Sequence, residues 1–127
     1  MKLRILVADD NRRALLALVT ALSREFDVIS TADNGRSALE QINQLQPSVA
    51  VLDLNMPHLN GIEVTREIVR QRLSCAVVIC SVAKAPELIE AALAAGALGY
   101  VCKPRLLQDL SIAVNHAAQG ESFVSKS

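Results

Sequence analysis

Four positions in this chain carry side chains that could do chemistry together, and each follows a short apolar run. They are the acidic pair Asp9-Asp10, then Asp53, Ser81 and Lys103. Three carboxylates in one crevice would repel one another, and a hard divalent cation such as Mg²⁺ would relieve that repulsion because it prefers oxygen ligands. A carboxylate can also act as a nucleophile and become an aspartyl phosphate. That reaction needs charge neutralisation and alignment, which a metal ion, an ammonium group and a hydroxyl donor supply.

The elements that would position these residues are five short apolar runs. The runs are rich in β-branched residues and mostly do not alternate with polar ones, which is typical of strands buried on both faces of a parallel sheet. They span residues 3–8, 28–32, 49–52, 76–80 and 98–102.

Amphipathic stretches separate the runs and predict five helices. A helix-spaced apolar stripe marks most of them, and Pro86 and Gly96 are typical of the first turn and the end of the fourth. The inward-facing residues expected in the other four are Leu15, Leu18, Val19 and Leu22; Ala38, Ile42 and Leu45; Ile62, Ile68 and Val69; and Leu110, Ala113, Val114 and Ala117.

Strict alternation of strand and helix predicts an α/β fold with a parallel sheet and helices on both faces. Five strands in this length match the flavodoxin-like order 2-1-3-4-5. In that order the carboxyl ends of strands 1 and 3 flank the crevice where such folds bind ligands. We therefore expect the four polar positions to converge at this edge of the sheet.

Composition limits the classes of function. The chain has 127 residues, enough for one domain, and 13 basic residues balance 13 acidic ones, so no broad surface for nucleic acid is indicated. Three cysteines without a paired spacing favour buried, reduced thiols. No apolar run approaches the roughly 20 residues needed to cross a bilayer, so we expect no membrane association and a cytoplasmic location.

The chain resembles the response-regulator receiver family along essentially its whole length. The residues that carry the resemblance are Asp9-Asp10, the segment VLDLNMPHLNG around Asp53, Ser81, and the closing GYVCKP with Lys103. Each of these is weak alone, but together they are highly specific.

The resemblance implies a role for each site residue in a phosphorylation switch rather than an enzyme. Asp53 would accept the phosphoryl group from a sensor histidine kinase, and Ser81 and Lys103 would bind the phosphoryl oxygens. The Mg²⁺ ligands would be Asp10, Asp53 and the backbone carbonyl of Asn55, with Asp9 holding the metal through water.

The resemblance also implies how the signal would leave the site. Ser81 would move toward the phosphate and Tyr100, the family's switch aromatic, would turn inward beneath the face formed by helix 4, strand 5 and helix 5. Helix 1 would meet the kinase, and a homodimer could form through the helix 4–strand 5–helix 5 face or through helices 1 and 5. The Lys103-Pro104 bond stands where the family commonly has a cis peptide.

The end of the chain is similar to the end of the receiver in NarL/FixJ-type regulators. This predicts a receiver domain over residues 1–120 and the start of a linker over 121–127, leading to a helix-turn-helix output domain that this chain lacks. DNA would be bound only through that domain. An excised receiver is favoured over a single-domain regulator.

Other interpretations stay open. A haloacid-dehalogenase-type phosphatase also uses an aspartate nucleophile, but its second acid would stand where Asn55 is. A nucleotide-binding module is disfavoured because no Gly-rich phosphate loop follows the first strand, and a non-phosphorylated interaction domain would keep the same fold. Asp9 and Asp10 could cap the first helix, and Val82 beside Ser81 departs from the small residue usual in the family and could crowd the site.

Overall fold

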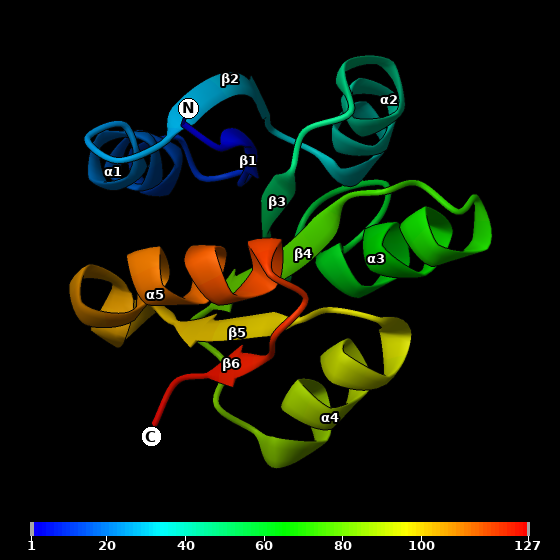
Figure 1. Ribbon diagram of the computed structural model, residues 1–127. Coiled ribbons are helices and arrows are strands. Elements are labelled where there is room, and N and C mark those ends of the chain that lie inside the picture. The colour runs from blue at the N-terminus through cyan, green and yellow to red at the C-terminus, as the bar shows by residue number, and fades with distance from the viewer. Residues whose placement is uncertain (1, 127) are drawn as a thin grey trace.

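A computed structural model describes residues 2–126 and places six parallel strands in one sheet (Figure 1). Their order is β2-β1-β3-β4-β5-β6, which contains the expected order 2-1-3-4-5 and adds one strand at its edge. The strands are β1 (Arg4–Ala8), β2 (Asp27–Ala32), β3 (Val49–Asp53), β4 (Ala76–Ser81), β5 (Gly99–Cys102) and β6 (Phe123–Val124).

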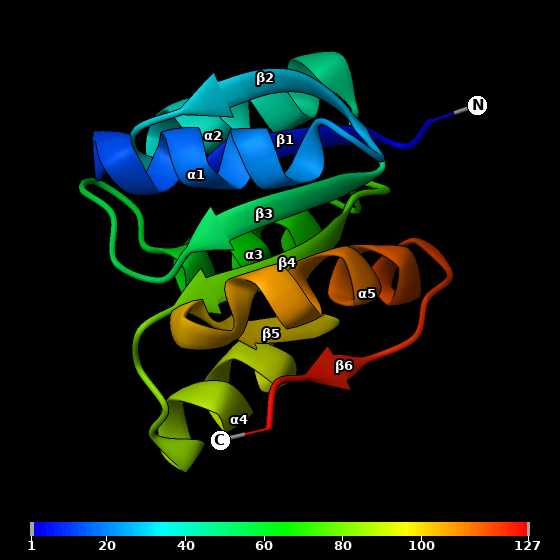
Figure 2. The ribbon, with the colours of Figure 1, turned by 90° about the vertical axis from the view of Figure 1, so that its left-hand side faces the viewer.

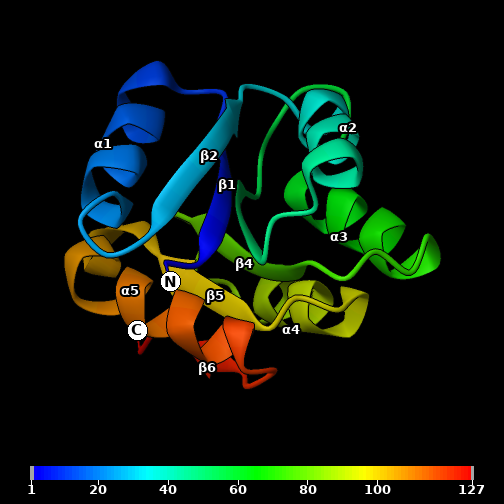
Figure 3. The ribbon, with the colours of Figure 1, turned by 45° about the horizontal axis from the view of Figure 1, so that its top comes forward.

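The helices form one layer on each face of the sheet, as the alternating pattern predicts. Helices α1 and α5 lie in front of the sheet in Figure 2, and α2, α3 and α4 cover the other face (Figure 3). Their bounds are α1 (Arg12–Leu22), α2 (Gly35–Leu45), α3 (Gly61–Arg70), α4 (Pro86–Ala95) and α5 (Leu106–Ala118), with a short 3₁₀ turn, η1 (Lys103–Arg105), before α5.

Side chains that alternate along the buried strands divide the core into two clusters. Ile5 and Val7 pack with Leu18 and Leu22 of α1 and with residues of α5, whereas Leu6 belongs to the cluster under α2, α3 and α4. Both clusters are apolar, which is why the strands read as continuous hydrophobic runs rather than as an alternating pattern.

Asparagine side chains start three of the helices. Asn11, Asn34 and Asn60 each accept a backbone N–H from the first turn of α1, α2 and α3, as favourable N-caps do. Pro86 opens α4 and Gly96 ends it with φ 120°, as predicted. These boundaries fix the lengths of the loops that carry polar residues at the carboxyl edge of the sheet.

Two of the predicted inward residues are exposed, and Leu15 and Val19 are only partly buried. Val69 is 56% exposed, because α3 buries the face formed by Ile62, Thr65 and Ile68, and Val69 points instead toward Gly96 at the end of α4. Leu45, in the last turn of α2, is also exposed. Both residues fit a helical period, but the stripe that packs on the sheet is narrower than the apolar stripe in the sequence.

The strand β6 was not predicted. It lies within residues 121–127, which the sequence suggested as the start of a linker, and it pairs in parallel with β5. Its two residues are flanked by serines and a glutamate, so no local pattern distinguishes it from a loop. Contact with the β5 edge, rather than local propensity, makes it a strand.

The three cysteines are reduced and buried, as predicted. Cys75, Cys80 and Cys102 are buried free thiols, and burial raises the pKa of Cys75 and of Cys80 to about 12. In the part of the chain that the structure describes, no helix has the length and hydrophobicity required to cross a bilayer.

We predict that the buried sheet, and not the loops at its carboxyl edge, carries the stability of the domain. Val51 in β3 is fully buried and Val82 after β4 is 68% exposed. Val51→Ala should lower the free energy of unfolding by about 2–4 kcal/mol, and Val82→Ala by less than about 0.5 kcal/mol. Chemical denaturation of both variants tests this, and equal losses would contradict it.

Candidate functional site

The four polar positions meet at the carboxyl edge of the sheet. Asp9 follows β1, Asp53 and Ser81 are the last residues of β3 and β4, and Lys103 follows β5. Because β1, β3, β4 and β5 are consecutive neighbours and parallel, their ends bring these residues to one place. The expected convergence is therefore seen in the structure.

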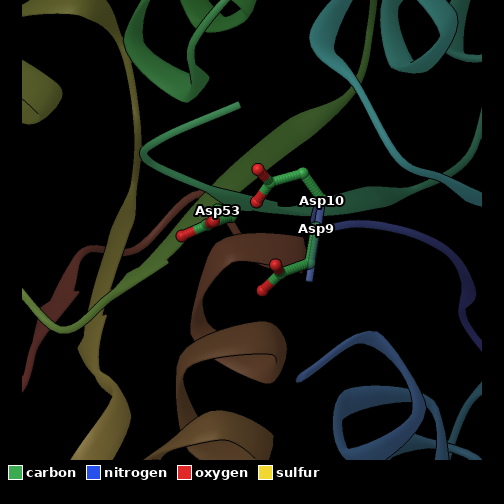
Figure 4. Close-up of side chains that lie close together, drawn as sticks. All are labelled: Asp9, Asp10 and Asp53. Carbon is green, nitrogen blue, oxygen red and sulfur yellow. The ribbon is translucent and has the colours of Figure 1, made fainter. Parts of the chain in front are cut away.

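Three carboxylates form the centre of the site. Asp9, Asp10 and Asp53 each place a carboxylate oxygen within 4.8 Å of the others, and Figure 4 shows the three side chains together at the ends of β1 and β3. Asp9 is fully buried and Asp53 is 7% exposed, whereas Asp10 faces solvent. The cluster could hold a metal ion, and its all-oxygen donor set fits a hard cation that keeps several waters.

Lys103 is the cation among these acids. Its Nζ lies 2.9 Å from Asp9 Oδ2 and 3.4 Å from Asp53 Oδ1. With all groups ionised, three negative charges and one positive charge leave a net charge of −2 in the crevice. A divalent cation would neutralise that charge.

The electrostatics of the site appear in two pKa shifts. Burial, together with the charges of Asp9 and Asp10, raises the pKa of Asp53 from 3.8 to about 6, against the opposing effect of Lys103. Burial alone would lower the pKa of Lys103, but the hydrogen bond to Asp9 and the charge of Asp53 raise it above its ordinary value. Lys103 therefore stays charged, whereas ionising Asp53 lowers the stability of the folded state.

Two glycines hold the loop that follows Asp53. A Cβ on Gly61 would lie 2.5 Å from the carbonyl oxygen of Asp53, and one on Gly35 would lie 1.9 Å from the carbonyl oxygen of Leu59. Gly61 N–H also donates to Leu54 C=O at 2.9 Å. Only a residue without a side chain allows α3 and α2 to start this close to the loop.

The first turn of α1 is capped by Asn11 and not by the acidic pair. Asn11 Oδ1 accepts the N–H of Ala14 at 3.0 Å, and Asp9 Oδ1 accepts the N–H of Asn11 at 2.9 Å. The interpretation of Asp9 and Asp10 as caps was therefore wrong, because the residue after them takes that position. The Asp9 carboxylate instead braces the turn that leads from β1 into α1.

Ser81 and Tyr100 both contact Ala83 in the loop after β4. Ser81 Oγ accepts the N–H of Ala83 at 3.1 Å, and Tyr100 Oη donates to the Ala83 carbonyl at 2.8 Å. Tyr100 is fully buried, with its ring in the cluster under α3 and α4. The role of the Ala83 backbone as their common partner has no signal in the sequence, since any residue provides the same groups.

The remaining predicted features lie around this centre. Asn55 is exposed in the loop after Asp53, and the exposed Val82 side chain is directed to solvent rather than packed over Ser81. No peptide bond among the described residues is cis, so the expected cis bond between Lys103 and Pro104 was wrong. Pro104 stands in the η1 turn, where the trans isomer, the more stable one for an X–Pro bond, is accommodated.

The fold and the site together define a class of protein. The fold is a doubly wound parallel sheet, and its switch-point crevice is where such folds bind ligands. There the acidic cluster could bind a cation, and Lys103 could bind an anion beside it. Comparison with known proteins identifies the family: residues 5–115 match the model of the response regulator receiver domain. The chain belongs to this family and is a signalling module, as the resemblance implied.

Curated relatives and solved structures agree with this assignment. The chain is 34% identical over 124 residues to the nitrate/nitrite response regulator NarL of Escherichia coli, covering 96% of this chain and 57% of that protein. It is 30% identical over 125 residues to the transcriptional regulatory protein DegU of Brevibacillus brevis, covering 97% of this chain and 53% of that protein. The chain thus spans between half and three fifths of the length of these relatives.

One solved structure is similar over nearly its whole length. A DNA-binding response regulator of the LuxR family from Staphylococcus aureus matches with a TM-score of 0.86 and 29% identity, and the match covers 91% of this chain and 98% of that chain. The relatives include NarL- and LuxR-type regulators, which confirms the predicted similarity to NarL/FixJ-type receivers.

We predict that the metal-free domain loses stability as the pH rises through the titration of Asp53. The raised pKa means that the folded state binds this proton more tightly than the unfolded chain does. The destabilisation is absent below pH 3.8, grows between 3.8 and about 6, and is complete above that. In a chelating buffer, Asp53→Asn should therefore raise the free energy of unfolding by about 1–3 kcal/mol at pH 7.5 and change it little near pH 4.

The exposed Asp27 at the start of β2 provides the control, because Asp27→Asn removes the same charge away from the crevice. Denaturation curves at the two pH values measure the difference. A gain of equal size for both variants, or a loss of stability for Asp53→Asn at pH 7.5, would show that the cluster does not strain the fold.

Proposed function

We propose that this chain is the phosphoacceptor domain of a two-component response regulator and that Asp53 takes the phosphoryl group from a histidine kinase. The observation that carries the proposal is the position of the Asp53 carboxylate. It lies within 4.8 Å of two further carboxylates and 3.4 Å from the Lys103 ammonium, at the edge where this fold binds ligands.

The acidic cluster would hold Mg²⁺ during the reaction. Asp10, Asp53 and the backbone carbonyl of Asn55 would be its ligands, with Asp9 acting through water. The ion would supply positive charge next to the phosphoryl oxygens, which is what phosphoryl transfer needs most.

The chain's own residues would then do the transfer. An oxygen of Asp53 attacks phosphorus, an O–P bond forms, and the bond from phosphorus to the donor histidine nitrogen breaks. Lys103 moves part of its contact from Asp9 to a phosphoryl oxygen, as a compact ammonium allows. Ser81 Oγ accepts from the Ala83 N–H, so its own hydroxyl hydrogen can be donated to another phosphoryl oxygen.

Ser81 and Tyr100 would transmit the effect of phosphorylation to the surface. Ser81 binds the N–H of Ala83 and Tyr100 binds its C=O, so a shift of Ser81 toward a phosphate would change the loop that leads into α4. Tyr100 already lies inward, which is the orientation expected of the phosphorylated switch. The output would therefore be expressed near α4 and β5.

A phosphatase of the haloacid-dehalogenase type is the weaker alternative. Its second acid would stand at position 55, where this chain has an exposed asparagine. A non-phosphorylated interaction domain is the other alternative, and it gives no reason for three acids and a lysine to share a buried crevice.

We place the receiver in a longer regulator. The relatives named above are about twice as long as the matched part, and one similar structure is described as a DNA-binding response regulator. Residues 1–120 would be the receiver and 121–127 the start of the linker to a helix-turn-helix output domain, through which DNA would be bound.

Self-association would use α1 and α5. Leu16 on α1 and Leu107 on α5 are 60% and 86% exposed, and both line a groove that runs between the two helices. The alternative face, α4–β5–α5, is less available because β6 pairs with the free edge of β5. Large exposed apolar side chains gathered on one face are typical of an interface.

The test of phosphorylation is intact mass after incubation with acetyl phosphate and Mg²⁺. Wild type and Asp27→Asn should gain one phosphoryl group, and Asp53→Asn none. Chelating the metal beforehand should prevent the gain. No adduct with any donor would favour the interaction domain, and steady release of phosphate from small phosphoesters would favour the phosphatase.

We predict that Leu107→Glu weakens self-association, because it places a charge in the apolar α1–α5 face. Val69→Glu is the control, since Val69 is an exposed apolar residue on α3, away from the α1–α5 face. Sedimentation over a range of concentrations, with and without acetyl phosphate, should show a dimer for wild type and Val69→Glu only. Identical behaviour of the two variants, or a wild type that stays monomeric throughout, would exclude this interface.

A further inference from the structure

The C-terminal segment 121–126, called the strap below, contains one buried polar residue. Ser125 is 6% exposed, whereas its neighbours Val124 and Lys126 and the earlier Ser122 are exposed. Burial of a hydroxyl is unfavourable unless its hydrogen bonds are made, and the Ser125 hydroxyl makes two.

Ser125 joins three parts of the fold. Its Oγ donates to Asp109 Oδ2 at 2.6 Å and accepts the backbone N–H of Cys102 at 3.1 Å. Asp109 is 5% exposed and also accepts from Arg105 Nε at 2.9 Å. The hydrogen bonds from Arg105 and Ser125 hold the pKa of Asp109 below its ordinary value, so this acceptor stays ionised.

The strap also continues the sheet along β5. Phe123 N–H donates to Leu98 C=O and Ser125 N–H donates to Tyr100 C=O, both at 2.9 Å. At the next step along β5, the donor is Cys102 N–H, and its acceptor is the Ser125 hydroxyl rather than a backbone carbonyl. The Phe123 ring packs edge-on against His116 of α5.

The hydrogen bonds of the strap are made to the backbone of Tyr100 and of Cys102, and both positions are linked to the site. Tyr100 is the buried aromatic that holds Ala83. Cys102 immediately precedes Lys103, whose ammonium contacts Asp9 and Asp53. The strap therefore binds the outer edge of the same short strand whose end delivers Lys103 to the acidic cluster.

We propose that Ser125 is a positioning residue for Lys103 and that docking of the strap on β5 is coupled to occupation of the Asp53 site. The inference rests on the proposed function. A group bound at Asp53 holds Lys103, and with it the end of β5, in the arrangement that the Ser125 hydroxyl recognises. Because coupling between two binding events is reciprocal, the docked strap must favour the occupied site by the same factor.

The sign of the coupling follows from the structure. The strap is docked while Tyr100 is inward and Lys103 points into the crevice, so the docked strap and the occupied site favour the same conformation of β5. Phosphorylation would then tighten the strap, and in a longer regulator the linker would leave the receiver from a more rigid point.

The experiment uses the whole chain labelled with ¹⁵N and titrated with beryllofluoride and Mg²⁺ as a stand-in for the phosphoryl group. Amide signals give the half-saturating concentration, and amide exchange of Phe123 and Ser125 reports docking of the strap. The variants are Ser125→Ala, Ser125→Thr, which keeps the hydroxyl, and Ser122→Ala, which removes an exposed serine from the same segment. Asp109→Asn weakens the contact from the other side, because a neutral amide oxygen replaces the charged acceptor.

In wild type, beryllofluoride should slow exchange at Phe123 and Ser125. Ser125→Ala should raise the half-saturating concentration about fivefold or more and remove the change in exchange at Phe123. Asp109→Asn should act in the same direction, Ser125→Thr should restore wild-type behaviour, and Ser122→Ala should not differ from wild type.

The inference is overturned if Ser125→Ala saturates at the wild-type concentration, or if strap exchange in wild type ignores beryllofluoride. A wild type that binds beryllofluoride and is phosphorylated on Asp53, with unaffected variants, would remove the strap coupling alone. A wild type that shows neither reaction would remove the proposed function and this inference together.

Discussion

The carboxylates of Asp9, Asp10 and Asp53 repel one another, and the fold must hold them together against that repulsion. Ions of like sign within a few ångströms, two of them buried, destabilise a fold, and Lys103 offsets only part of that effect. The chain keeps them together because the buried centre of the sheet holds the ends of β1 and β3 rigidly. A flexible loop carrying the same residues would move them apart, and the concentration of negative charge that could hold a metal ion would be lost.

The sheet can hold this arrangement because its centre is almost entirely apolar. β1 and β3 lie between other strands and are covered on both faces, so neither end can shift without disturbing close-packed side chains. Gly35 and Gly61 add a second constraint, because their lack of a side chain lets the starts of α2 and α3 pack directly against the loop after Asp53. Packing at a distance from the crevice thus determines the separations within it.

Much of this could be predicted from sequence because it follows from short-range patterns. Apolar runs ending in Asp9, Asp53, Ser81 and Lys103, alternating with helical stretches, place those residues at one edge by topology alone. The exposure of Val69 could not be predicted, since it depends on which side of α3 meets the sheet. The strand β6 and the bond from Ser125 to Cys102 were equally hidden, because tertiary contact and not local propensity creates them. Distances and pKa shifts in the crevice likewise depend on burial, which no spacing encodes.

Strand β5 is the element through which a change at the site could reach the surface. Its four residues, Gly99–Cys102, lie between the Ala83 loop, which Tyr100 contacts from inside, and the strap, which pairs along the outer edge. Lys103 then links the end of the strand to two of the three acids. A strand this short cannot adjust one edge independently of the other, because its backbone groups bond alternately to β4 on one side and to the strap on the other. We therefore expect a change in charge at Asp53 to alter the α4 loop and the C-terminal segment together, without a long pathway between site and surface.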